Sequence, residues 1–151
     1  MIPLHIDLNK YPISLMAFKL QIVTPEGKAF SDEVTDVVLP GTLGEMGILP
    51  SHSNLVSTLS PGELRYTKDG NVIEFAIGGG FAEITGDHVN VLTDMAIGSD
   101  KIDEAVVEAA LASAQARLSD TSNISAEEVA AVEAAIANSI VQLKLKRKRR
   151  V

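Results

Sequence analysis

The sequence predicts an α+β protein, in which an N-terminal antiparallel β-sandwich precedes a C-terminal antiparallel hairpin of two helices. Two observations carry this prediction. Between residues 16 and 98, short runs of alternating apolar and polar residues are separated by turn-forming sequences. From residue 99, the apolar residues recur at helical spacing, in two segments joined by a short polar stretch. Because the period changes once, from 2 to about 3.6, the chain divides into a strand-rich part and a helical part.

We therefore expect three regions: an extension at 1–15, a β-sandwich domain at 16–98, and a helical hairpin with a basic tail at 99–151. The extension has two prolines and no clean period, so it is predicted to be loosely ordered. It lacks the basic start and apolar core of a signal peptide, and no apolar run approaches the roughly 20 residues of a membrane helix. With no cysteine, the chain fits a reducing, cytoplasmic compartment.

The strand predictions follow from alternation. Apolar Phe18, Leu20 and Ile22 alternate with polar residues, and 24–27 then turns the chain. A second apolar strand covers 34–39. Further strands are predicted at 55–60, 64–67, 73–77, 81–85 and 89–91, with turns at Ser60-Pro61-Gly62, Asp69-Gly70, Gly78-Gly79-Gly80 and Gly86-Asp87.

The stretch 39–55 interrupts this alternation. Gly41, Gly44 and Gly47 recur every third residue, and Pro40 and Pro50 stiffen its ends. We interpret the stretch as a shaped loop that is neither a helix nor a central strand. Its apolar side chains either pack beneath the sandwich or face a partner, and the sequence leaves both open; they are Leu43, Met46, Ile48 and Leu49.

Two helices follow. The first is predicted to begin with Ser99-Asp100 as N-cap, and the second with the capping box of Ser125 and Glu128. The apolar stripes are Val107, Leu111, Ala114 and Leu118 on the first helix, and Val129, Val132, Ile136, Ile140 and Leu143 on the second. Twelve alanines lie between 105 and 137. Burial of apolar surface contributes roughly 25 cal/mol per Å², and alanine offers little apolar surface. We therefore expect the helical hairpin to dock weakly.

The net charge of −7 is unevenly distributed. Residues 1–100 carry thirteen acids and five bases, and 101–143 carry seven acids and two bases. The basic tail reverses this balance with six cations in seven positions: Lys144, Lys146, Arg147, Lys148, Arg149 and Arg150. Such a cluster repels itself and is predicted to need an acidic surface.

No set of residues in the sequence predicts catalysis. The three histidines, His5, His52 and His88, are isolated and lack metal-ligand spacing. The glycines at 78–80 are followed by neither Gly-Lys-Ser/Thr nor a helix start, so we interpret them as structural. We predict no catalytic residue, no metal site and no cofactor.

Four segments occur in an informative order: F-K-L-Q-I-V-T-P-E-G at 18–27, D-V-V-L-P-G-T-L-G-E-M-G-I-L-P-S-H at 36–52, I-G-G-G-F-A-E-I at 77–84 and V-N-V-L-T-D-M-A at 89–96. Together with the alanine-rich helices, this order resembles the epsilon subunit of bacterial and chloroplast F-type ATP synthases, from residue 16 to about 148. The resemblance implies a non-catalytic central-stalk subunit, which couples c-ring rotation to the catalytic head and restrains ATP hydrolysis through its C-terminal helices.

The resemblance also implies partners and contact residues. The partners are the gamma subunit and the c ring, with the alpha and beta subunits when the helices extend, at the cytoplasmic face of an energy-transducing membrane. The ring-facing segment would comprise Gly41, Gly44, Glu45, Met46, Gly47, Ile48 and His52, with Glu45 at its tip. The basic tail would inhibit hydrolysis by binding an acidic stretch of the beta subunits.

One motif departs from the family. Many bacterial members begin the first helix with Ile/Leu-Asp-x-x-Arg-Ala, part of a regulatory ATP site; here Ile102 and Asp103 remain, but Val106 and Val107 replace the Arg and Ala. Without that guanidinium we predict no nucleotide site. An alternative function is a stand-alone module whose basic tail binds nucleic acid or an acidic membrane surface. The acidic body, which lacks a basic patch with interleaved aromatics, argues against nucleic acid.

Overall fold

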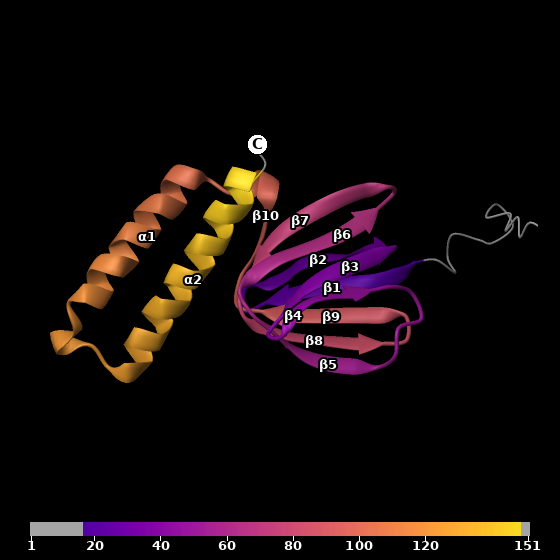
Figure 1. Cartoon of the computed structure of the whole chain (residues 1–151), viewed down its shortest axis with the longest axis horizontal. Helices are drawn as coiled ribbons and strands as arrows, with labels where there is room; N and C mark the ends of the chain where they lie inside the picture. The colour runs from indigo at the N-terminus through magenta and orange to yellow at the C-terminus, as the bar shows by residue number, and fades with distance from the viewer. Residues whose placement is uncertain (1–16, 149–151) are drawn as a thin grey trace, which may run out of the picture.

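The computed structural model describes residues 17–148 and consists of a β-sandwich followed by two antiparallel helices (Figure 1), which confirms the predicted fold class. The strands are β1 (Phe18–Thr24), β2 (Gly27–Val34), β3 (Asp36–Gly41), β4 (Gly44–Ile48), β5 (Leu55–Leu59), β6 (Gly62–Lys68), β7 (Asn71–Ile77), β8 (Gly80–Thr85), β9 (His88–Thr93) and β10 (Ala96–Gly98). Two short 3-10 helices, η3 (Ser99–Lys101) and η4 (Thr121–Asn123), precede α1 (Glu104–Ser119) and α2 (Ala126–Lys148), respectively. The predicted extension at 1–15 lies outside the described residues.

The strands form one continuous sheet in the order β10-β7-β6-β3-β5-β8-β9-β1-β2, with β4 paired to β3. All described pairs are antiparallel except β1 with β9, which is parallel and was not predicted. The alternation also missed β2, because this strand lies at the end of the sheet order and is mostly polar. An edge strand covers little of the core, so it needs no regular apolar face.

The sandwich core is mainly aliphatic. Leu20, Ile22, Leu39 and Ile77 are fully buried in it. Tyr66 also belongs to this core, and the partly buried rings of Phe30 and Phe75 pack against it, with ring centroids 4.5 to 6.2 Å apart. Because inward residues alternate with outward ones, the opposite face of each strand stays available for other contacts.

The stretch 39–55, predicted as an irregular loop, is instead mostly a β-hairpin, so that prediction is wrong for 39–48. β3 and β4 pair from Val37↔Ile48 to Gly41↔Gly44 and are joined by Thr42 and Leu43. Of the three glycines in this stretch, Gly44 has a positive φ, of 127°. The spacing of three thus reflects one turn that needs glycine, not a glycine-rich coil.

The glycines at 78–80 permit close packing, in keeping with a structural role. A Cβ atom at Gly80 would lie 1.8 Å from the carbonyl oxygen of Leu92 on β9. Only a residue without a side chain allows β8 to approach β9 so closely.

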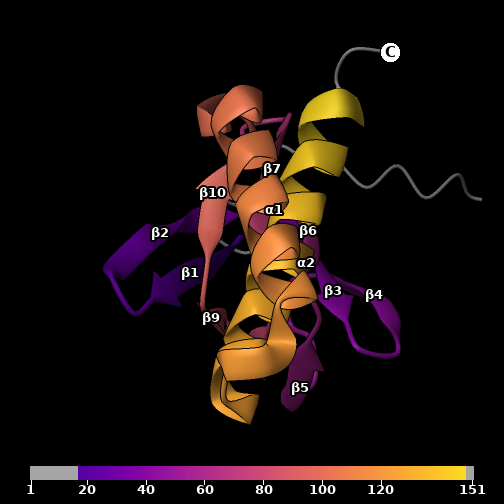
Figure 2. The ribbon, with the colours of Figure 1, turned by 90° about the vertical axis from the view of Figure 1, so that its left-hand side faces the viewer.

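The helical hairpin, residues 104–148, docks through one helix. α2 lies between the sandwich and α1, as both views show (Figures 1 and 2). A second apolar cluster joins the two parts and comprises Ala76 of β7, Ile102, Val107, Leu143 and Leu145. Leu143 of the predicted second stripe is buried, which confirms that assignment, whereas Ile140 is 38% exposed and its assignment is wrong. Ser139 and Leu145, which were not predicted, are also buried.

The helix starts differ in how well they were predicted. Ser99 and Asp100 belong to η3, and α1 is capped by Asp103, whose Oδ1 accepts a hydrogen bond from Val106 N at 3.2 Å. The predicted N-cap at Ser99-Asp100 is therefore wrong. The capping box of α2 is confirmed, since Ser125 N donates to Glu128 Oε2 at 3.1 Å and Glu128 N donates to Ser125 Oγ at 3.2 Å.

Candidate functional site

The β3–β4 hairpin brings the predicted ring-facing residues onto two different faces. Leu43 is fully exposed at the turn, and Glu45 is 59% exposed on β4 beside it, so Leu43 and not Glu45 forms the tip. Ile48 is 2% exposed within the sandwich core, and Met46 packs against that core. A contact between Ile48 and a partner is therefore excluded by burial, and we correct that expectation.

The remaining predicted residues have structural contacts. Gly41 pairs with Gly44 at the end of the hairpin, and Gly47 is exposed on β4. His52 lies in the loop after β4, where its Nδ1 is 2.7 Å from Ser53 O. The imidazole thus caps its own loop. The outward side chains available for a partner thus include Leu43, Glu45 and Leu49, of which Leu49 is 64% exposed after β4.

Glu45 is held by Arg65 of β6. The guanidinium donates two hydrogen bonds to the carboxylate, from Nη1 to Oε1 at 3.2 Å and from Nη2 to Oε2 at 3.0 Å. These bonds and the positive charge of Arg65 lower the pKa of Glu45, and Lys148 lowers it further. Glu45 is therefore a pre-oriented carboxylate at the side of the β3–β4 hairpin.

The basic tail is partly neutralised by acids of the same chain. Arg147 donates from Nε to Glu104 at 2.9 Å and from Nη2 to Glu108 at 2.6 Å, both on α1. Lys148 Nζ instead reaches the sandwich, at 3.0 and 3.3 Å from the two oxygens of Glu63 and at 3.6 Å from Glu74 Oε1. Lys144 is exposed, Lys146 is half-buried, and Arg149 and Arg150 lie outside the described residues.

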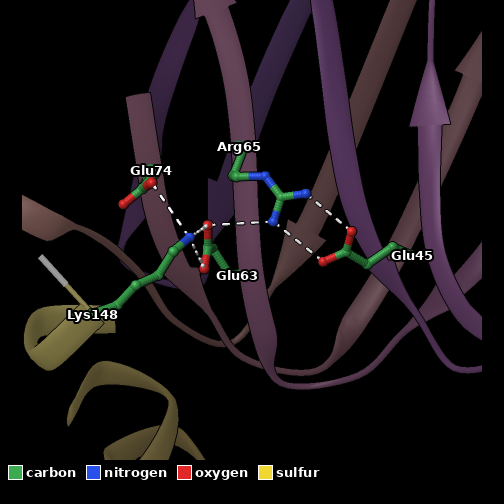
Figure 3. Close-up of polar contacts among 5 residues, drawn as sticks. All are labelled: Glu45, Glu63, Arg65, Glu74 and Lys148. Carbon is green, nitrogen blue, oxygen red and sulfur yellow. Dashed lines mark hydrogen bonds and ion pairs between the residues drawn. The ribbon is translucent and has the colours of Figure 1, made fainter. Parts of the chain in front are cut away.

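These contacts join the two predicted sites. Arg65 also donates from Nη1 to Glu63 Oε1 at 3.4 Å, so five side chains form one row: Glu45, Arg65, Glu63, Lys148 and Glu74 (Figure 3). Strand alternation places Glu63 and Arg65 on the same outer face of β6, opposite inward Leu64. The β3–β4 hairpin and the last turn of α2 are thus connected through charges.

The residues that match the family's ATP motif have structural contacts here. Ile102 is buried in the second apolar cluster, and Asp103 caps α1. Val106 is 63% exposed and contributes no cation. A triphosphate would therefore find no guanidinium at this position.

Two features of this surface were not predicted from the sequence. One is Arg65. It is the only arginine before residue 117 in the sequence, and this isolation could have marked it as a candidate. The other is a group of exposed apolar side chains on the outer face of β5, β8 and β9, where Val56, Phe81 and Leu92 are 69%, 57% and 51% exposed. Phe81 and Leu92 are cross-strand partners, and such contiguous exposure is typical of a protein interface.

Within residues 17–148, no group of three or more His, Cys, Asp or Glu side chains could hold a metal ion. In the same part of the chain, neither helix combines the length and apolar character that crossing a membrane requires.

Comparisons with known proteins agree with this architecture. Residues 17–99 match the family described as "ATP synthase, Delta/Epsilon chain, beta-sandwich domain". The chain is 39% identical to an ATP synthase epsilon chain of Herpetosiphon aurantiacus, over 89% of this chain and 98% of that one. It is 44% identical to that of Desulforamulus reducens, over 66% of this chain and 76% of that one.

A solved structure has the same fold. A chain in the cryo-EM structure of Euglena gracilis mitochondrial ATP synthase (OSCP/F1/c-ring, rotational state 1) matches with a TM-score of 0.67 and 22% identity. The match covers 89% of this chain and 81% of that one.

Proposed function

Since the chain belongs to the ATP synthase delta/epsilon chain family, we propose that it is a non-catalytic epsilon subunit that couples c-ring rotation to the catalytic head. It is a central-stalk subunit. The observation that carries this function is its similarity to an epsilon chain along 98% of that relative's length, which includes the helical hairpin as well as the sandwich. It associates with the cytoplasmic face of an energy-transducing membrane peripherally, through the complex.

The ring-facing contact is made by Leu43 and Glu45. Both are exposed on a rigid two-stranded hairpin, and a fully exposed leucine at a turn has no role in the core. Glu45 is already ordered by Arg65, which lowers the entropy cost of forming a polar contact. This assignment replaces the earlier expectation that included Ile48.

The gamma subunit docks on the exposed apolar group of β5, β8 and β9. Val56, Phe81 and Leu92 offer a surface that water solvates poorly, while α2 occupies the face of β6 and β7. Replacing Phe81 with glutamate should abolish co-purification of gamma with a tagged chain, since a charge in the centre of an apolar interface is costly to desolvate. Val72→Glu, at an exposed apolar position on β7, is the matched control; equal loss in both variants would contradict the assignment.

The ring contact is tested in the assembled enzyme. The double variant Leu43→Ala/Glu45→Gln should lower proton pumping per ATP hydrolysed in reconstituted vesicles, with gamma still co-purifying. The control is Val72→Ala/Glu33→Gln, which changes an exposed apolar residue and an exposed acid elsewhere on the sandwich. Pumping equal to that of the control would exclude the ring contact.

Restraint of hydrolysis requires release of the helical hairpin. In the docked arrangement Arg147 and Lys148 bind acids of their own chain, so a beta-subunit acidic surface must compete for them. The exposed alanines of both helices add little docking energy, which makes release accessible. No observation favours a stand-alone nucleic-acid module over this function.

A further inference from the structure

The row of five charged residues connects elements that are distant in sequence. Glu45 lies on β4, Glu63 and Arg65 on β6, Glu74 on β7 and Lys148 in the last turn of α2 (Figure 3). Glu63 and Glu74 are only 20% and 16% exposed, so their attraction for Lys148 is less screened than that of a surface pair.

We propose that this row is a latch that holds the C-terminal end of α2 on the sandwich, and that its strength depends on the charge of Glu45. Binding of Glu45 by a cation of another protein then loosens α2. The coupling rests on the proposed function in one respect, which is that the β3–β4 hairpin faces a partner.

Of the tail bases within residues 17–148, Lys148 is the one that can serve as the latch. Arg147 binds Glu104 and Glu108, which lie on α1 and move together with α2, so those ion pairs survive detachment. Lys148 binds Glu63 and Glu74 of the sandwich, and these pairs must break. Among the tail residues that the structure describes, Lys148 alone has ion pairs across this boundary.

The sign of the coupling follows from the contacts. Glu63 Oε1 accepts from both Arg65 and Lys148, at 3.4 and 3.0 Å. If Glu45 loses its charge, or forms an ion pair with a cation of another protein, Arg65 loses Glu45 as its partner. Arg65 then keeps Glu63 and competes with Lys148 for it. The hydrogen bond to Glu63 raises the pKa of Lys148, and the positive charge of Arg65 opposes that rise, whereas Lys148 and Glu45 attract each other. Both effects weaken the latch.

Linkage makes the effect reciprocal. A partner that binds Glu45 more tightly when α2 is released must, to the same extent, favour release when it binds. A contact at Glu45 thereby changes the availability of the tail at the other end of the charged row, without a change in the fold.

The test measures opening of the docked face in the full isolated chain. The chain has no native cysteine, so Ala76→Cys introduces a single thiol on β7, at a fully buried position beneath Leu143 and Leu145. Its rate of reaction with a thiol reagent, divided by the rate in the denatured chain, gives the opening equilibrium even when the open state is rare. Ala82→Cys, inside the sandwich core, reports opening of the sandwich itself.

We expect Glu45→Gln to raise the Ala76→Cys labelling rate about twofold to fivefold, the range of a partly exposed ion pair. Lys148→Gln should raise it at least as much, and Glu45→Gln should add nothing in the Lys148→Gln background, because its effect passes through Lys148. Glu33→Gln and Lys101→Gln are the matched exposed controls and should leave the rate unchanged.

Two results would overturn the latch. One is a Glu45→Gln rate equal to that of Glu33→Gln. The other is an undiminished effect of Glu45→Gln when Lys148 is already neutral. Because the assay contains no c ring, its outcome is independent of whether Glu45 contacts the ring, which the pumping experiment decides.

Discussion

Truncation of Leu143 should release the helical hairpin and leave the sandwich folded. Leu143 is 5% exposed in the second apolar cluster, which is separate from the sandwich core. Buried Leu→Ala substitutions cost about 2–5 kcal/mol. We expect Leu143→Ala to weaken docking of the helical hairpin by about 2 kcal/mol, the low end of this range. Val107 belongs to the same hairpin, so contacts within the cluster that involve it are kept on detachment and do not contribute to docking. At 1.4 kcal/mol per factor of ten, the detachment equilibrium should rise about 30-fold.

The assay compares the labelling rate of Ala76→Cys alone with that of the double variant Ala76→Cys/Leu143→Ala. Ile140→Ala is the control, since Ile140 lies one turn earlier on α2 and is 38% exposed. It should raise the rate far less than Leu143→Ala. Hydrogen exchange of the β8 and β9 amides should stay unchanged in both variants. If Leu143→Ala accelerates exchange in β8 and β9 as much as labelling at position 76, the helical hairpin and the sandwich unfold as one cooperative unit, and the hairpin does not detach on its own.

Three further predictions concern other parts of the molecule. Gly80→Ala should destabilise the sandwich by about 3 kcal/mol, the upper end for overpacking, because its Cβ would meet Leu92 O at 1.8 Å, whereas Gly47→Ala has open space; equal melting temperatures would contradict the close approach. The NMR titration midpoint of Glu45 should lie below 4.5 and should rise in Arg65→Gln; a midpoint at or above 4.5 refutes the pairing. Because the pKa is lowered in the folded chain, the ion pair stabilises the fold above pH 4.5, and this stabilisation is lost as the pH falls through the lowered pKa. Calorimetric titration should detect no ATP binding by the isolated chain, since Val106 supplies no guanidinium, and submillimolar affinity would overturn this.

Alternation and helical periodicity predicted the fold class because burial controls both patterns. They failed where burial is weak. β2 is a polar edge strand, and β4 was hidden among glycines and a proline that were interpreted as a loop. The interpretation of Ile48 failed because β4 was interpreted as a loop: within a strand Ile48 points inward and is buried, whereas in a loop it could have faced a partner.

The charged row could not be predicted from one sequence. Glu45 and Arg65 are twenty positions apart, and their contact depends on β3 lying between β4 and β6 in a particular register. Lys148 and Glu63 are 85 positions apart and depend on how α2 docks. Sequence patterns report the environment of each residue, but partner identity across strands depends on pairings that no local pattern encodes.

The tail's need for an acidic surface was predicted, and the structure supplies part of that surface within the chain itself. This changes how inhibition must be tested. Salt screens exposed charges over roughly 8 Å at physiological ionic strength, so raising it weakens both the latch at Glu63 and any contact with an acidic beta-subunit surface. The first effect releases the helical hairpin and the second frees the catalytic head, so their consequences for ATP hydrolysis oppose each other. Salt dependence alone therefore cannot identify the inhibitory contact. Neutralising Glu63 separates the two, because Glu63→Gln weakens the latch, with the Lys148–Glu74 pair left, and keeps every tail cation available to the partner. Inhibition should strengthen if the tail acts on the head, and stay unchanged if it does not.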